Sequence, residues 1–228
     1  MRKFVLGMIG AVAFSTAANA QSANWSGPSI GASGGYGWGN ASQVTSPIPP
    51  PPIFITDHSY SLDGGMIGGG IGYDFQTGPW VLGLLADYSW ANLRGGTTAT
   101  TCGPLECGAE LRSFGTVRGR LGYATGIWLP YVTGGFAFGD VWAFNNNIGV
   151  SGSNMHTGWT AGGGIEAMFA PNWSAKIEYL YADLGSSTPY QLAPGVPESV
   201  SVTANILRVG VNYRFNAPPA PAPLVRKY

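Results

Sequence analysis

Residues 80–90 read Trp-Val-Leu-Gly-Leu-Leu-Ala-Asp-Tyr-Ser-Trp, and this stretch decides the fold. Its even positions are apolar or aromatic, whereas Asp87 and Ser89 occupy odd positions. A period of two is typical of a β-strand, because successive side chains point to opposite faces. The stretch is longer than the ~5–6 residues of an ordinary strand. It matches the ~9–11 residues that a tilted strand needs to cross a bilayer.

Seven further segments repeat this pattern, at 29–38, 66–76, 116–123, 129–141, 159–169, 175–181 and 207–215. One face carries nearly all the charge together with glycine, and the other carries Leu, Val, Ile and aromatic residues; the pattern of 129–141 assigns no face. A soluble sandwich also alternates, but it turns its apolar face inward and many charges outward. The segregation seen here favours an apolar face against lipid and a polar face around an enclosed interior.

The connections between these segments are of two kinds. Tight turns are expected at 77–79, 125–127 and 170–172, and long surface loops near 39–60, 94–110, 142–156 and 185–200. Short and long connections alternate along the chain, as in an up-and-down barrel whose short turns share one side. The barrel must close, because an open edge would leave unpaired N–H and C=O groups in hydrocarbon. The sequence therefore predicts an all-β fold, an eight-stranded antiparallel up-and-down transmembrane β-barrel over residues 21–215.

The composition agrees with this class and excludes others. Only 10% of the 228 residues are charged, against roughly 25% in soluble domains. Eleven basic and eleven acidic residues balance, so a nucleic-acid partner is not expected. No apolar run after the N-terminus reaches the ~18 residues of a membrane helix.

The two ends of the chain differ from the barrel. Residues 1–20 combine a basic start, a short apolar stretch and Ala18-Asn19-Ala20, which predicts a signal peptide cleaved between Ala20 and Gln21. Residues 216–228 are rich in Pro and Ala, which favours an extended tail on the periplasmic side. That tail is either a passive flexible end or, through Arg226 and Lys227, a contact with peptidoglycan.

Charged residues on the polar faces are expected to meet inside the barrel. An interior of eight strands is just wide enough for side chains to fill it, and an unpaired buried charge is very costly. We therefore expect a network of ion pairs; the alternative is a pore in which the arginines select anions. The predicted interior charge network comprises Asp74, Asp87, Arg112, Arg118, Arg120, Glu166, Lys176, Glu178, Arg208 and Arg214.

Cys102 and Cys107 are the only cysteines and lie in one long loop. Because the mature chain is exported to an oxidising compartment, a disulfide between them is expected. Two cysteines and two histidines offer too few ligands for a metal site. No catalytic nucleophile–base pair and no phosphate loop is evident, so neither an enzyme nor a cofactor is expected. Aromatic residues near the strand ends are expected to form girdles at the membrane interfaces.

Several longer segments carry a family resemblance, namely 114–123, 129–135, 157–162, 172–181 and 208–215. Taken in order, they resemble the opacity-type "porin family" of outer-membrane β-barrels of alphaproteobacteria, which is similar in architecture to the barrel of outer membrane protein A. The resemblance implies an assembly signal in the last strand, at Arg208, Gly210, Tyr213 and Phe215. Family members commonly end at the strand-terminal Phe, whereas this chain continues beyond it.

The expected function is that of a structural outer-membrane protein that supports the envelope and presents surface loops. The first alternative is a narrow passive channel, and the second is binding by the loops, either of hemin or of a host partner. The expected partners are outer-membrane lipids, lipopolysaccharide and the outer-membrane assembly machinery, with peptidoglycan as a partner only in the second of the two interpretations of the tail.

Overall fold

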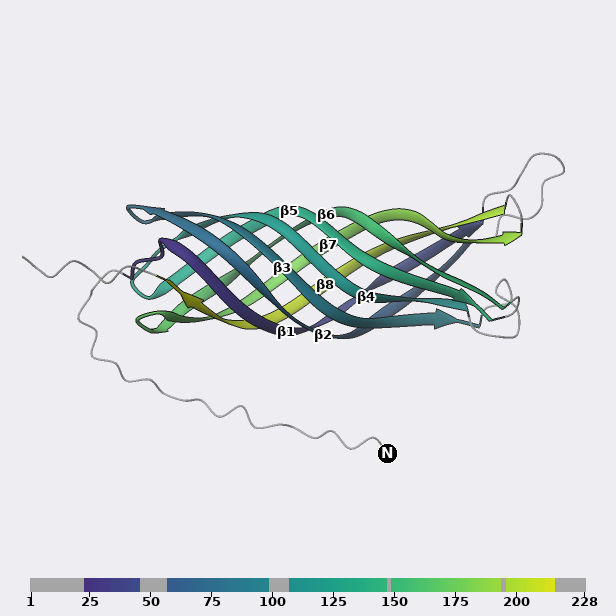
Figure 1. Cartoon of the computed structure of the whole chain (residues 1–228), viewed down its shortest axis with the longest axis horizontal. Coiled ribbons are helices and arrows are strands. Elements are labelled where there is room, and N and C mark those ends of the chain that lie inside the picture. Colours follow the sequence, from purple (N-terminus) through teal and green to yellow (C-terminus); the bar gives the residue numbers. More distant parts are fainter. Residues whose placement is uncertain (1–22, 46–56, 99–106, 147–148, 194–195, 216–228) are drawn as a thin grey trace, which may run out of the picture.

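The protein is an eight-stranded barrel. A computed structural model describes residues 23–45, 57–98, 107–146, 149–193 and 196–215 (Figure 1). The strands are β1 (Gly27–Thr45), β2 (Asp57–Thr77), β3 (Trp80–Thr97), β4 (Cys107–Tyr123), β5 (Trp128–Asn145), β6 (Val150–Ala170), β7 (Trp173–Ala193) and β8 (Val196–Arg214). Within these ranges, no helix is long and apolar enough to span a membrane.

Closure comes from pairing of the first strand with the last. Each strand is antiparallel to its chain neighbour, and β1 pairs with both β2 and β8. The turns that follow β2, β4 and β6 lie at one end, called here the turn end, where β1 also begins and β8 finishes (Figure 1). Gly78 and Gly126 adopt positive φ in two of these turns, a conformation that costs glycine little. The opposite end is called here the loop end. The closed antiparallel barrel of eight strands confirms the predicted fold class.

The strands are longer than the sequence predicts. Strands β5 and β6 leave only residues 146–149 between them, and β7 and β8 leave only 194–195. The loops predicted near 142–156 and 185–200 are therefore wrong in extent, because most of these residues belong to strands. Strands also extend into the ranges predicted as loops near 39–60 and 94–110.

The outer surface carries two aromatic bands separated by aliphatic side chains. Near the turn end, the Trp80 and Tyr123 ring centroids lie 5.2 Å apart, and those of Trp173 and Tyr213 lie 5.1 Å apart. The second band, farther toward the loop end, contains Tyr36, Trp38, Tyr88, Trp90, Trp159 and Tyr179, all exposed. Exposed aliphatic residues between the bands include Ile71, Leu82, Leu84, Val132 and Val209. Such bands are typical of the two interfaces of a bilayer.

Beyond the second aromatic band, toward the loop end, the inner face of the strands becomes apolar and the outer face becomes polar. In β8, Arg208 and Arg214 point inward near the turn end, whereas Val202 and Ile206 point inward farther toward the loop end, all of them buried. The inner side of this loop-end part is an apolar cluster, the apolar plug: Ala41, Tyr60, Leu62, Met66, Leu93, Ala109, Leu111, Phe114, Ala137, Val141, Ala143, Leu180, Ala182, Leu184, Val200, Val202, Ala204 and Ile206. The outer side there carries polar residues such as Asp63, Asn92 and Asn205. The loop-end part is thus built like a water-soluble barrel, and this explains why strands continue past the lipid-facing alternation.

His156 is an unusual member of the loop-end interior. It is 1% exposed, and its ring nitrogens make no hydrogen bond of good geometry among the described residues, although the Gly185 backbone lies close to the ring. It is paired in register with Gly139, whose inner side meets the Ser113 carbonyl oxygen, Leu111 and Leu184. A buried polar group without a partner costs about 1–3 kcal/mol.

We therefore expect His156→Leu to raise the free energy of unfolding by about 1–3 kcal/mol. The measurement is heat- or urea-induced unfolding of the refolded barrel in detergent. Met155→Leu is the matched control, because Met155 is the next residue along the strand but is 53% exposed. A destabilised His156→Leu barrel would contradict the expectation.

Candidate functional site: the charged barrel interior

The interior of the turn-end half contains a dense set of ionised side chains. Nine of the ten predicted network residues lie there, and Arg112 does not. Eight of the nine form two closed groups, each of two arginines and two carboxylates. They are the loop-side quartet (Asp87, Arg118, Glu178, Arg208) and the turn-side quartet (Asp74, Arg120, Glu166, Arg214).

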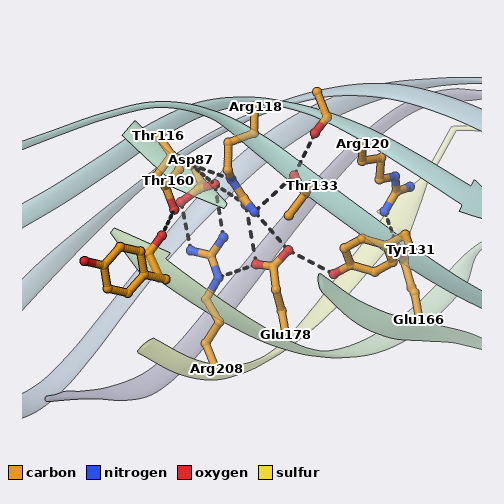
Figure 2. Close-up of polar contacts among 12 residues, drawn as sticks. Asp87, Thr116, Arg118, Arg120, Tyr131, Thr133, Thr160, Glu166, Glu178 and Arg208 are labelled. Atoms are coloured by element: carbon orange, nitrogen blue, oxygen red, sulfur yellow. Dashed lines mark hydrogen bonds and ion pairs between the residues drawn. The ribbon is translucent and has the colours of Figure 1, made fainter. Parts of the chain in front are cut away.

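In the loop-side quartet each arginine contacts both carboxylates (Figure 2). Arg118 lies 2.8 Å from Asp87 and 3.0 Å from Glu178. Arg208 lies 2.8 Å from Asp87 and 2.6 Å from Glu178. The four residues come from β3, β4, β7 and β8, so the ring of charges joins strands on different sides of the barrel.

The turn-side quartet has the same closed pattern. Arg120 pairs with Asp74, and it lies 2.6 Å from Glu166. Arg214 also pairs with Asp74, and it lies 3.2 Å from Glu166. Its residues come from β2, β4, β6 and β8, and all four are buried. Each quartet is electrically neutral, which is the condition under which buried charges are tolerated.

Neutral side chains complete the hydrogen bonding of the carboxylates. The Tyr131 hydroxyl donates to Glu178 at 3.0 Å, and the Thr116 hydroxyl donates to Asp87 at 2.7 Å. The Asn212 amide donates to Glu166 at 2.9 Å, and Ser174 donates to the same oxygen. Both oxygens of each of the four carboxylates therefore accept at least one hydrogen bond.

Arg112 was predicted to lie inside, and this prediction is wrong. Its side chain is 45% exposed, it pairs with Glu110 at 3.5 Å, and its guanidinium carbon lies 4.4 Å from the Trp142 ring centroid. The register of β4 shifts between Leu111 and Gly115, which indicates a β-bulge. A bulge adds one residue to a strand, so strict alternation fails across it. Leu111 turns inward there, and Arg112 points outward.

Lys176 is interior, as predicted, but it belongs to neither quartet. It lies opposite Glu166 in the β6–β7 register. Among the described residues it has no carboxylate within 4.0 Å, the distance that defines the other ion pairs.

Apolar residues close the interior on both sides of the quartets. The apolar plug lies toward the loop end, and a second cluster of Trp25, Val81, Leu129 and Met168 lies toward the turn end. Arg214 donates to the Trp25 carbonyl at 2.7 Å, and its guanidinium carbon lies 5.0 Å from the Trp25 ring centroid. Strand alternation gives no signal for Trp25, because this residue precedes the first strand and belongs to no alternating segment.

The remaining predicted sites are placed only in part. Arg208 is in the loop-side quartet, while Tyr213 and Phe215 lie on the outer face with ring centroids 4.9 Å apart. Recognition of these three residues and Gly210 by the outer-membrane assembly machinery stays a prediction. Cys107 is buried at the start of β4, whereas Cys102, Ala20 and Gln21 lie outside the described residues. The disulfide and the cleavage site therefore stay predictions as well.

The chemistry of this interior is that of a static ionic structure. Its carboxylates are held by arginines, which remain charged at every ordinary pH. The described part of the chain contains no group of three His, Cys, Asp or Glu residues that could hold a metal ion. The arrangement joins strands and fills space, and it offers no evident nucleophile–base pair.

Comparison with known proteins places this architecture in a family. Residues 6–215 match the family model described as outer membrane protein beta-barrel domain. The chain is 37% identical to the 31 kDa outer-membrane immunogenic protein of Brucella melitensis biotype 1, over 88% of each chain. It is 30% identical to the 25 kDa outer-membrane immunogenic protein of Brucella abortus biovar 1, over 84% of this chain and 80% of the relative.

Among solved structures, Neisserial surface protein A has a similar fold, with a TM-score of 0.52 and 16% identity, over 83% of this chain and 98% of that one. Because the family match covers the whole barrel, the chain belongs to the outer membrane protein beta-barrel domain family and is an integral protein of the outer membrane.

Proposed function

We propose that this protein is a non-conducting barrel that stabilises the outer membrane and presents its loop-end rim at the cell surface. The observation that carries this proposal is the layered interior: an apolar cluster at the turn end, two neutral quartets, and then the apolar plug. The short turns of outer-membrane barrels face the periplasm, so the loop end faces outward.

The layered interior weighs against an open passive channel. Water and ions would need to cross both quartets and an apolar cluster on each side. Removing one partner from a buried ion pair typically costs about 3–5 kcal/mol, and an open path requires several such pairs to separate together. This supports the structural role over the narrow channel.

Surface presentation is supported by the loop-end wall. Strands continue beyond the second aromatic band with polar residues outside and the apolar plug inside, so the rim stands clear of the lipid. The Brucella relatives are described as outer-membrane immunogenic proteins, and that description supports a surface that a host can meet. Loop-mediated binding of hemin or a host partner has no specific observation in its favour.

The proposed partners follow from this position. The aromatic bands and the aliphatic belt between them fit outer-membrane lipids and lipopolysaccharide, and the last strand fits the assembly machinery. Contact with peptidoglycan through residues 216–228 is proposed on composition alone. The proposed role requires neither catalysis nor a cofactor.

Conductance across a planar bilayer tests the proposal. Refolded protein in concentrated KCl is expected to give no sustained current steps, with a wide general porin as the positive control. Stable steps in every insertion, with a conductance that rises in proportion to KCl, would favour the channel instead.

A further inference from the structure

Among the described residues, Lys176 is the interior cation that belongs to neither quartet. Its neighbours Glu166 and Glu178 already accept hydrogen bonds at both carboxylate oxygens. Among the described residues, its ammonium has neither an ion pair nor a hydrogen bond. A buried ammonium group is costly unless an acceptor faces it.

The charges of the described interior also indicate that Lys176 lacks a counter-ion. Each quartet contributes two positive and two negative groups, so the two quartets sum to zero. Lys176 lies near Glu166 and Glu178, whose charges the arginines already balance, so it leaves the described interior with one excess positive charge. In a low-dielectric interior an excess charge is strongly unfavourable, so a counter-ion is required if the lysine stays protonated.

A cavity lies where that counter-ion would be needed. It has a volume of about 30 Å³ and is lined by Lys176, Arg118, Arg120, Arg208 and Asn212, with Asp87 as the only carboxylate. Its opposite wall is formed by β1 and β2, where Gly31, Gly70 and Gly72 have no side chains to fill the space. A single water molecule needs a cavity of about 10–15 Å³, so this cavity has room for a small ion.

We propose that this cavity binds one small monovalent anion of the size of chloride. Lys176 is the primary ligand, and Arg118, Arg120 and Arg208 line the cavity beside it. Four cationic groups and a single carboxylate favour an anion over a metal cation. The volume is too small for phosphate or for a carboxylate metabolite. The bound anion makes the interior neutral and fills the space beside the glycine wall.

Bromide locates the site directly, because it replaces chloride and scatters anomalously. Crystals of the detergent-solubilised barrel are soaked in bromide, and an anomalous peak is expected in the cavity beside the Lys176 Nζ atom. Ordered water without an anomalous signal, or peaks confined to the protein surface, would overturn the proposal.

A solution measurement tests the same site by linkage. At constant ionic strength, replacing gluconate by chloride is expected to raise the folding equilibrium constant about tenfold for each tenfold rise in chloride above half-saturation. Lys176→Met, which keeps the chain length and removes the charge, is expected to abolish this dependence. Arg112→Gln removes a cation from the outer wall and should retain it. An equal chloride dependence in the Lys176→Met barrel would overturn the proposal, and if that variant fails to fold, the bromide result decides.

Discussion

Arg118→Gln is expected to lower the free energy of unfolding of the refolded barrel by about 3–5 kcal/mol, which is the cost of removing one partner from a buried ion pair. Arg118 is 1% exposed and contacts Asp87, Glu178, Thr116 and Thr133. Glutamine is too short to reach both carboxylates, so their negative charges lose half of their arginine partners. The measurement is urea-induced unfolding in detergent micelles, together with the heat-induced mobility shift on gels.

Arg112→Gln is the matched control, because it removes the same group from the same strand. Its side chain is 45% exposed, and exposed ion pairs contribute only about 0–1 kcal/mol. Equal loss of stability in the two variants would contradict the quartet as a source of stability. Unchanged heat resistance of Arg118→Gln would contradict it as well.

Double substitutions separate the two quartets. Arg118 and Arg208 share the same two carboxylates, so their losses should not add. Arg118 and Arg120 lie in different quartets, so the loss in that double variant should be closer to the sum of the single losses. The unfolding free energies of the three single and two double variants are compared. If the stability losses of Arg118 and Arg208 add as fully as those of Arg118 and Arg120, the two quartets do not act as separate units.

Gly64→Ala is expected to prevent stable folding, at a cost of at least about 3 kcal/mol, the upper end for overpacking. A Cβ atom at Gly64 would overlap the Asn92 carbonyl oxygen and lie 3.0 Å from the Leu93 Cα atom. Both obstacles are backbone atoms of the neighbouring strand, and they can move only if β2 and β3 separate. The measurement is the folded fraction after refolding into detergent, read from the gel mobility of unheated samples.

Gly65→Ala is the control for that experiment, since it lies next to Gly64 and points to the other face. The nearest atom to its added Cβ would be the Gly35 carbonyl oxygen at 4.0 Å, an ordinary van der Waals distance. Near-normal folding of Gly65→Ala beside failure of Gly64→Ala identifies strand approach as the cause. A Gly64→Ala barrel of normal stability would refute it.

The sequence is sufficient to predict the barrel and its charged interior. Alternation in segments such as 80–90 assigns faces, because one residue of shift would place a charge in lipid. Asp87, Glu178 and Arg208 are on the inner face for that reason, and their pairing is confirmed. The grouping into two quartets depends on cross-barrel distances, which strand alternation does not encode.

Three features cannot be predicted from strand alternation, each for a physical reason. Arg112 is misassigned because a β-bulge changes the alternation within β4. The strands are predicted too short because the sidedness reverses beyond the lipid, where valine points inward and asparagine outward. Trp25 is missed because its role depends on Arg214, a residue near the opposite end of the sequence.

The apolar plug has a consequence for how this protein can diverge. Because it holds the strand ends together from within, the rim does not depend on the loops for its shape. Substitutions and length changes in those connections are expected to leave the scaffold intact, at little cost in folding. Sequence drift should therefore concentrate at the rim, while the wall beneath it changes slowly.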